Sequence, residues 1–508
     1  MAIKRYFAKA DNTITNAFRE NLSTRGSGSN MGASDILEVF SIYGQNSSSS
    51  GLTSEVSRVL IEFETSASTN SIKADRDAGI IPASGSVSFF LRMFNAPHGQ
   101  TLPTSFTMDV SAISGSWNEG TGLDMEEYRD IGRSNFFERQ TNVLWSTAGG
   151  DYYTDLSSSF TASFESGTED IDLDITTLVE QFVNSDGNVL GHKEDNGVGV
   201  FISNAFETAE RSYYTKKFFA RGTEFFFKRP HIEARWNSSI EDDRGNTFYS
   251  SSLATGEENL NTIFLYNYFR GRLRNIPAIG TGNIGVSLYE HGVGGPTTDS
   301  IDLVVDGTHV LAATPKVITG SHVSTGIYKA SFALTAAATP LTRIHDVWFQ
   351  LASNVTQASD TATQFVTGSI NPKTINVSTI APSNDFHVNV TNLRNTYGKS
   401  ETARFRIYTR KKDWSPTIYT KAVAEPELNL VESGSFQIFR VIDELKVIPY
   451  GTGSNKHTFL SYDQSGSYFD LDMAMLEPGY RYGINLAFYN EDIGDYVEQT
   501  ETFKFKVD

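Results

Sequence analysis

The sequence predicts an all-β protein: a large N-terminal β-domain with one short helix, followed by two immunoglobulin- or fibronectin-III-like β-sandwiches. Three observations support this prediction. Apolar and polar residues alternate over many short stretches, which is typical of strands with one buried face. Glycine, serine, threonine and asparagine are abundant, whereas only 14 residues are proline. Long amphipathic helices are hard to find, and aromatic residues make up 12% of the chain, enough to fill several cores.

Composition also limits the partners and the compartment. The 508 residues carry a net charge of −18, and so acidic a surface repels phosphate backbones and anionic lipid. We therefore expect no nucleic-acid partner, and no stretch approaches the roughly 18 apolar residues that a membrane span needs. The chain has no cysteine, which excludes disulfides and cysteine-based metal sites. The N-terminus also lacks an apolar signal segment, so we expect synthesis in a cytoplasm.

An aromatic-rich stretch, residues 213–236 (YYTKKFFARGTEFFFKRPHIEARW), closes the large N-terminal domain. We predict two strands joined by a turn at 221–222, with the second strand running through 225–227. Pro230 then interrupts the pairing. A last alternating strand follows over 232–236, and its apolar residues face one side of the sheet.

Two alternatives remain open for the first 34 residues. Their apolar side chains have spacings that build neither a strand nor a helix cleanly: Ile3, Tyr6, Phe7, Ile14, Phe18 and Leu22. The segment 1–34 is either the first strand of the domain or an arm that folds into a groove of a neighbouring subunit. The arm alternative predicts a homo-oligomer or ordered array, with contacts through this arm and the terminal sandwich.

The best helix pattern lies within residues 170–182 (DIDLDITTLVEQF). Ile171 and Leu173 alternate as in a strand, and Asp174 can then cap a short helix. The apolar residues that follow have helical spacing, so one face of this helix is expected to be buried.

Beyond Trp236 the pattern changes. Residues 238–260 are polar and predict a junction, and the short strands within 261–352 predict an immunoglobulin-like sandwich. Residues 353–369 are rich in threonine, alanine and serine and predict a linker. Residues 370–508 predict a second sandwich of the immunoglobulin or fibronectin-III type. Its sequence LEPGYRY predicts a tyrosine corner, in which a tyrosine hydroxyl bonds back to the backbone.

Several motifs agree in order and approximate spacing with one known family. They are residues 58–63 (RVLIEF), 87–94 (VSFFLRMF), 116–120 (SWNEG), Trp145, 175–182 (ITTLVEQF), 197–200 (GVGV) and 228–232 (KRPHI). Residues 55–237 thereby resemble the DNRLRE (disaggregatase-related) β-jelly-roll domains, which include carbohydrate-binding modules. The family usually has tryptophan where this chain has Phe182. The resemblance implies that residues 35–237 form a jelly roll of two antiparallel sheets with a short helix across one end.

Two further stretches, ITNAFREN…GSNMGASDILEVFSIYGQ and KKFFARGTEFFFKRPHIEARW, carry a second resemblance. They are similar to virion structural proteins of tailed bacteriophages, especially the contractile-tailed phages of cyanobacteria. This resemblance implies a component located in the virion, in contact with other virion proteins. It implies no reaction and no site residues.

Carboxylates supply the metal candidates. Asp170, Asp172 and Asp174 alternate on one strand face, where they could bind Ca²⁺ together with loop carbonyls. The alternative is a solvated sheet edge plus a helix cap. Asp186 is a further calcium candidate, although its loop lacks the terminal glutamate of an EF-hand. We predict no other cofactor, because the sequence has no HxH, HExxH, GxSxG or P-loop motif.

Aromatic and basic side chains supply the binding candidates. Trp117, Trp145, Tyr152 and Tyr153 form either a sugar-stacking platform or part of the core. A basic island in this acidic chain is expected either to dock an acidic neighbour or to protect a sheet edge from strand pairing. It comprises Lys216, Lys217, Arg221, Lys228 and Arg229.

Three hypotheses of function follow. The first is a non-enzymatic structural component on the exterior of a phage neck, tail or head, which mediates protein–protein assembly. The second is a carbohydrate-binding module for host attachment, with a host-surface glycan as partner. The third is a polysaccharide hydrolase, which would need a pair of carboxylates.

Overall fold

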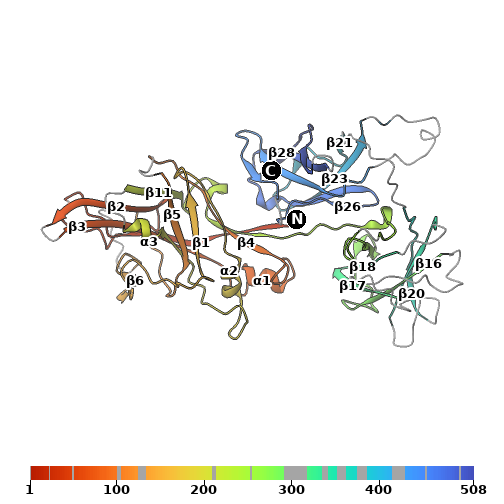
Figure 1. The fold of residues 1–508 in the computed structure, drawn as a ribbon, viewed down its shortest axis with the longest axis horizontal. Coiled ribbons are helices and arrows are strands. Elements are labelled where there is room, and N and C mark those ends of the chain that lie inside the picture. The colour runs from red at the N-terminus through yellow and green to blue at the C-terminus, as the bar shows by residue number, and fades with distance from the viewer. Residues whose placement is uncertain are drawn as a thin grey trace.

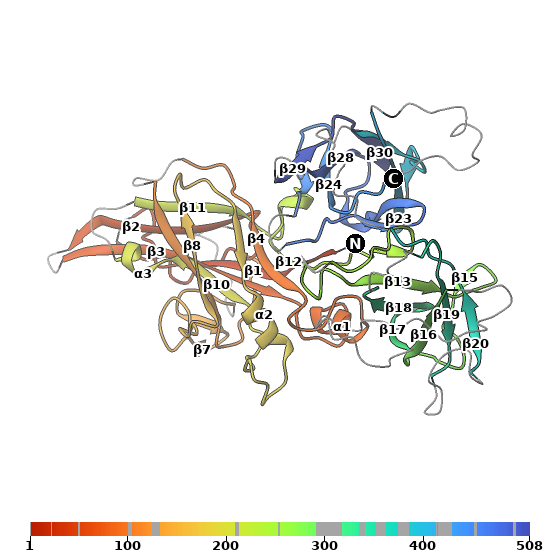
Figure 2. The same ribbon diagram turned by 45° about the vertical axis from the view of Figure 1, so that its right-hand side comes forward.

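Strand pairing divides the protein into a jelly roll and two sandwiches, so the predicted all-β fold is confirmed (Figures 1 and 2). The computed structural model describes residues 2–21, 23–48, 51–99, 104–123, 133–208, 213–251, 254–290, 317–334, 341–351, 362–373, 386–412, 414, 429–451, 455–490 and 494–508. In Figure 1 the jelly roll runs from red to yellow-green, the middle sandwich is green to teal and the terminal sandwich is blue. No helix in these ranges is long and apolar enough to cross a membrane.

The jelly roll is built from strands of both sheets and a few short helices. Its strands are β1 (Ile3–Thr15), β2 (Ile36–Ser48), β3 (Gly51–Phe63), β4 (Ser88–Met93), β5 (Phe106–Ala112), β6 (Glu138–Gln140), β7 (Val143–Leu144), β8 (Ser159–Phe164), β9 (Ile171–Asp174), β10 (Val198–Ile202), β11 (Tyr213–Phe219) and β12 (His231–Arg235). Its helices are α1 (Ile72–Asp77), α2 (Thr176–Val183), α3 (Asn204–Glu207) and the 3₁₀ helix η1 (Phe226–Lys228).

Strand β1 belongs to both sheets of the jelly roll. Its first half pairs with β12, which continues the sheet through β4 to β9. Its second half pairs with β3, which continues through β10 and β5 to β8 and also pairs with β2. The register shifts between Ala8 and Ala10, so Lys9 is a bulge at the point where the strand crosses over. A common apolar core lies between the two sheets.

The N-terminal segment is therefore a strand, and the prediction of an arm is wrong. Ile14 is fully buried, and Asn12 Nδ2 donates to both oxygens of Ser134, at 3.1 Å and 2.8 Å. The loop that follows β1 is tied to the same place, because Met31 N donates to Asn12 Oδ1 at 2.9 Å. The weak alternation of this strand reflects packing on both faces, since its second face is covered by loops.

The predicted helix is confirmed at α2, directly after β9. Asp174 supports its first turn as expected, because its Oδ1 accepts from Thr176 N at 2.9 Å, although Ile175 is the N-cap residue. The prediction of a single helix was wrong, because α1 and α3 also form. The α1 sequence has a capping serine, and Ser71 Oγ accepts from Ala74 N at 3.0 Å.

The expected strand over 225–227 does not form. These residues turn through η1 and leave the sheet, and Arg229 Nε and Nη2 hold the turn by donating to Thr223 O, both at 3.1 Å. Three consecutive phenylalanines fit a strand by propensity, but Phe226 and Phe227 pack against the core of the terminal sandwich, while Phe225 contacts Phe219 of β11. Tertiary packing therefore overrides the local preference.

Six strands of the middle sandwich pair in one continuous order, and a two-stranded hairpin pairs separately from them. Its strands are β13 (Asn261–Tyr266), β14 (Tyr268–Phe269), β15 (Arg272–Leu273), β16 (Ile284–Tyr289), β17 (Ile318–Ser324), β18 (Ile327–Phe332), β19 (His345–Phe349) and β20 (Gln364–Thr367). The predicted linker 353–369 is wrong in its second half, because β20 pairs with β19 and Ile370 lies in the core of this unit. The 3₁₀ helix η2 (Asp243–Gly245) lies in the predicted junction 238–260.

In the terminal sandwich, two sheets pack on either side of a separate apolar core. It contains β21 (Phe386–Val390), β22 (Thr396–Tyr397), β23 (Thr402–Lys411), β24 (Gly434–Arg440), β25 (Lys446–Ile448), β26 (Ser461–Asp463), β27 (Gly466–Asp472), the 3₁₀ helix η3 (Met473–Met475), β28 (Arg481–Asn490), β29 (Asp495–Glu498) and β30 (Phe503–Val507). The predicted tyrosine corner is present: Tyr482 is fully buried, and its hydroxyl donates to Glu477 O at 2.8 Å.

A prediction follows from the position of β1. Deleting residues 2–15 removes the only strand that joins the two sheets in the described chain, so the jelly roll should fail to fold. Ile14→Ala is the milder variant and should cost about 2–5 kcal/mol, whereas Ile14→Val should cost about 0.5–1.5 kcal/mol. Urea unfolding measures both. A truncated chain that keeps the wild-type melting curve would contradict the central position of β1.

Candidate functional site

Strand β12 is buried on both faces, which is unusual for a jelly-roll strand with alternating residues. Ile232 and Ala234 point into the jelly-roll core. His231, Glu233 and Arg235 point the other way, where solvent would be expected, yet each is at most 7% exposed. The terminal sandwich covers this face, so β12 forms the centre of an interface between two units.

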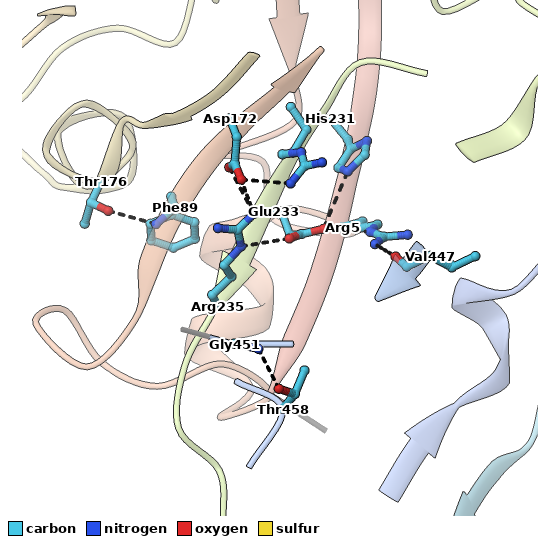
Figure 3. Close-up of polar contacts among 11 residues, drawn as sticks. Arg5, Phe89, Asp172, Thr176, His231, Glu233, Arg235, Val447, Gly451 and Thr458 are labelled. Carbon is cyan, nitrogen blue, oxygen red and sulfur yellow. Dashed lines mark hydrogen bonds and ion pairs between the residues drawn. The ribbon is translucent and has the colours of Figure 1, made fainter. Parts of the chain in front are cut away.

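An alternating chain of charges from the jelly roll lines this interface (Figure 3). Glu233 lies between two arginines: its Oε2 accepts from Arg5 Nε at 2.9 Å and its Oε1 from Arg235 Nε at 2.8 Å. Arg235 Nη2 also donates to Asp172 Oδ1 at 3.0 Å, and Arg92 Nη1 donates to Asp172 Oδ2 at 2.9 Å. Burial opposes ionisation of Glu233, but the charge of Arg5, followed by that of Arg235, outweighs it and holds its pKa well below the usual range.

The terminal sandwich meets this chain of charges directly. Arg5 Nη2 donates to Val447 O, on β25, at 2.5 Å. In the loop between β25 and β26, Gly451 N donates to Thr458 Oγ1 at 2.7 Å (Figure 3). Burial, followed by the charge of Arg235, lowers the pKa of His457 in that loop to about 4. His457 is therefore neutral at pH 7 and adds no charge to the interface.

His231 lies at the edge of the same network and is 1% exposed. Its Nδ1 donates to Arg229 O at 2.8 Å, which fixes the ring orientation and leaves Nε2 as an acceptor. Nε2 is 3.7 Å from Glu233 Oε2, beyond hydrogen-bond distance, and has no hydrogen-bond donor. Burial lowers the pKa of His231, so the ring is neutral at pH 7.

Two phenylalanines of η1 complete the interface. Phe227 is 6% exposed and belongs to the core of the terminal sandwich, where the Arg440 guanidinium lies 5.4 Å from its ring centre. Phe226 packs beside it and also contacts Phe7 of β1, with ring centroids 5.4 Å apart. The jelly roll thus inserts an aromatic plug into its neighbour, next to the charged network.

The predicted basic island is not one surface. Lys216 is fully buried, and its Nζ donates to Asn95 Oδ1 at 2.7 Å and to the carbonyls of Gly167 at 3.1 Å and Glu169 at 2.6 Å. Burial lowers the pKa of Lys216 to about 8. Lys216 cannot dock a neighbour, because the jelly roll uses it as an internal donor.

The other members of the predicted island lie apart from one another. Lys217 forms an ion pair with Glu38 at 2.6 Å, and Arg221 forms one with Glu119 at 2.7 Å. Arg229 is occupied by its own turn. Lys228 alone borders the interface between the units, with its Nζ 4.7 Å from the centre of the Phe219 ring. The prediction that these five residues form a single assembly surface is therefore wrong.

The predicted stacking platform is divided as well. Trp117 and Trp145 are 6% and 5% exposed and fill a small second core on the outer face of β1 and β3. Their Nε1 atoms donate to Asn196 O and Asn135 O, both at 3.0 Å. A platform that includes these two tryptophans is therefore wrong. Tyr152 and Tyr153 instead line an open cavity of about 540 Å³.

The calcium candidates are not brought together. Asp170 Oδ1 accepts from Asn95 N at 2.7 Å, and Asp172 is occupied by two arginines. Asp186 has a side chain 98% exposed, in a different loop. Among the residues that the structure describes, no group of three or more His, Cys, Asp or Glu side chains could hold a metal ion.

Sequence reasoning missed the interface residues Arg5, His231, Glu233 and Arg235. Charged residues that alternate with apolar ones in a strand favour a solvated face, and nothing local shows that a domain more than 200 residues away covers them. Two features of the sequence do point to a cover. Phe226 and Phe227 are adjacent apolar rings in a turn, and Glu233 and Arg235 place charges of both signs two residues apart on one face of a strand.

Comparisons with known proteins identify no family. No protein-family model and no curated protein matches the sequence. Among solved structures, the Ig1-2 module of the Drosophila receptor protein tyrosine phosphatase DLAR is 8% identical, with a TM-score of 0.13, over 49% of this chain and 91% of that one. The native form of E. coli alpha-2-macroglobulin is 8% identical with a TM-score of 0.15, and the match covers 99% of this chain but 26% of that one. A DUF4785 protein of Legionella pneumophila is 7% identical, with a TM-score of 0.12, over 99% of this chain and 90% of that chain. At these scores no function can be transferred.

A prediction tests the buried network. Glu233→Gln leaves Arg5 and Arg235 without their shared countercharge and should cost about 3–5 kcal/mol of unfolding free energy. Asp172→Asn removes a carboxylate that is 43% exposed, so its cost should be at most about 1 kcal/mol. Urea denaturation of the full chain measures both. Equal costs for the two variants would show that burial of Glu233 does not set the strength of the interface.

Proposed function

We propose that the protein is a non-enzymatic structural component on the exterior of a bacteriophage virion, at the neck, tail or head, where it mediates protein–protein assembly. The observation that carries this proposal is the interface between the jelly roll and the terminal sandwich. The aromatic plug of Phe226 and Phe227 and the hydrogen bond from Arg5 Nη2 to Val447 O join the two units there. The similarity of the sequence to virion structural proteins of tailed phages supports the location.

The chemistry of the interface also favours a structural role. A general acid or base needs a titratable group that a substrate can reach. In this network both oxygens of Glu233 and both oxygens of Asp172 accept hydrogen bonds from arginines. These carboxylates are used to pair the arginines of the jelly roll, and Arg5 also reaches Val447 O of the terminal sandwich.

Purified particles provide the test. Mass spectrometry of virions from the phage that encodes the chain should find the protein in stoichiometric ratio to other structural proteins. Protease added to intact particles should cleave it, because the proposal places it on the exterior. If it is absent from washed particles while infected cells contain it, the proposal is wrong.

A second function is supported by a specific cavity. The open cavity beside Tyr152 and Tyr153 also exposes Phe201, Arg58 and Asp151 on the outer face of the jelly roll. The ring centroids of Tyr152 and Phe201 are 4.7 Å apart. Rings beside hydrogen-bonding side chains are typical of sites that bind small polar ligands. We propose, as the alternative role, binding of a host-surface glycan for attachment, at this cavity instead of at Trp117 and Trp145.

The variant Phe201→Ala tests the glycan-binding role. Phe201→Ala should reduce binding to host-surface polysaccharide at least about tenfold, the effect of losing one good contact, while the melting temperature stays close to wild type. Phe225→Ala removes an aromatic side chain that is 48% exposed elsewhere and serves as the control. A glycan array and a polysaccharide pull-down measure binding. If the wild-type protein binds no host glycan, the alternative role is excluded.

A further inference from the structure

A two-stranded hairpin of the middle sandwich carries a cluster of arginine and aromatic side chains. Strands β14 and β15 pair Tyr268 with Leu273, and Phe269 with Arg272. Tyr268 is 62% exposed and Phe269 is 51% exposed. Three arginines of the hairpin are exposed as well: Arg270, Arg272 and Arg274. Residues 261–289 contain these arginines and no other charged side chain, which is a local reversal of charge in a chain of net charge −18.

The arginines gather around Phe269. The guanidinium carbon of Arg270 is 5.3 Å from the centre of the Phe269 ring, and that of Arg274 is 5.4 Å from it. Arg272 lies directly opposite Phe269 in the hairpin and shares its face. Within the part of the chain that the structure describes, none of the three forms an ion pair with a carboxylate. Their N–H donors are therefore available to an added anion.

The preference of the turn does not account for these residues. Arg270 and Gly271 occupy its two central positions with φ of 50° and 78°. Two positive φ angles are typical of the type I′ turn, in which asparagine or aspartate usually precedes the glycine. Arginine at a positive φ is uncommon, and such backbone outliers gather at functional sites. The side chain of Arg270 is thus present in spite of the turn, which indicates a role in a contact.

The base of the hairpin is fixed to the turn between β17 and β18. Asn267 N donates to Gly326 O at 2.7 Å, and Arg274 N donates to Asn267 O at 3.0 Å. Gly326 N donates in turn to Asn275 Oδ1 at 2.6 Å. Figure 2 shows β15 at the end of the middle sandwich that lies away from the jelly roll. The cluster is held in shape and presented outward, so binding costs the hairpin little conformational entropy.

The types of side chain indicate which anionic partner fits. Tyrosine and arginine are enriched among the residues that dominate the binding energy of protein interfaces. A planar guanidinium pairs with a carboxylate through two parallel hydrogen bonds. The exposed rings of Tyr268 and Phe269 need apolar contacts beside those pairs. A polypeptide surface with acidic and aliphatic side chains supplies both groups.

Extended polyanions fit the hairpin less well. Nucleic acid, an anionic bilayer and an acidic polysaccharide spread their negative charge over a long or wide surface. Such a surface would meet neighbouring parts of this acidic chain, and the repulsion acts over a Debye length of about 8 Å at physiological ionic strength. An acidic patch on a folded protein can be confined to the size of the hairpin. Charge complementarity at this scale favours an acidic polypeptide segment.

We propose that the hairpin of β14 and β15 binds an acidic polypeptide segment of another protein. Its carboxylates pair with the arginines around Phe269, and its aliphatic side chains pack on Tyr268 and Phe269. This inference rests on the proposed structural function and names the chemistry of one partner. The hairpin supplies far fewer residues than the roughly 20–30 on each side of a standard interface. The contact is therefore weak by itself and suited to an assembly in which many copies bind together.

Binding of defined probes to the full-length chain tests the proposal. One probe is a labelled peptide in which glutamate, leucine and glycine repeat, and its neutral match has glutamine at every glutamate. In fluorescence anisotropy at low salt the acidic peptide should bind at least about tenfold more tightly than the glutamine peptide, and added salt should weaken it. Arg272→Glu should lower the affinity for the acidic peptide at least about tenfold, because it places like charges together.

Arg343→Glu is the matched control, since it makes the same charge change at an exposed arginine outside the hairpin, and it should leave the affinity unchanged. Thermal unfolding confirms that each variant is folded. Equal binding of the two peptides, or normal binding by Arg272→Glu, overturns the proposal. Tighter binding of a single-stranded oligonucleotide, phosphatidylserine vesicles or polygalacturonate, lost in Arg272→Glu, assigns the hairpin to that polymer and also overturns it. None of these results decides whether the protein is present in virions, which particle mass spectrometry measures separately.

Discussion

Glu233 between Arg5 and Arg235 is the interaction on which the arrangement of the jelly roll and the terminal sandwich depends. Removing three charged groups from water is costly, and the cost is offset only where geometry and hydrogen bonding are good. Here each carboxylate oxygen accepts a charge-assisted bond below 3 Å. The outward face of β12 can therefore be covered by another domain instead of water.

Strand β1 connects this interface to the rest of the jelly roll. Its first half supplies Arg5 to the interface, and its second half, beyond the bulge at Lys9, enters the other sheet. There Asp11 is 1% exposed, and burial raises its pKa to about 7. Asn12 ties the covering loops to the same strand. One continuous backbone thus fixes the plane of both sheets and the position of the neighbouring unit.

Whether a cationic side chain already has an acceptor within the chain distinguishes internal contacts from surfaces that a partner could bind. Lys216, Lys217 and Arg221 are each paired with acceptors of the jelly roll itself. Lys228 and Lys446 line a cavity between the units and form no ion pair within the described residues. A basic stretch in the sequence contains both kinds, and only their partners in space separate a structural cation from one available for recognition.

The sequence by itself determined the local properties of this protein. Period-two alternation predicted the strands, the pattern after Asp174 predicted α2, and the LEPGYRY stretch predicted the corner that Tyr482 makes. These features depend on neighbours within a few residues or on a buried face of the same strand. The sequence also predicted that the units have apolar cores, because apolar residues are buried away from water.

Only the tertiary structure decided which faces are covered. Trp117 and Trp145 are in a core instead of on a platform, Phe226 and Phe227 are a plug instead of part of a strand, and Glu233 is buried instead of solvated. Each outcome depends on a segment distant in sequence that supplies the other half of the contact. Burial and electrostatics act through space, so a residue's chemical role is set by partners that its own sequence neighbourhood does not specify.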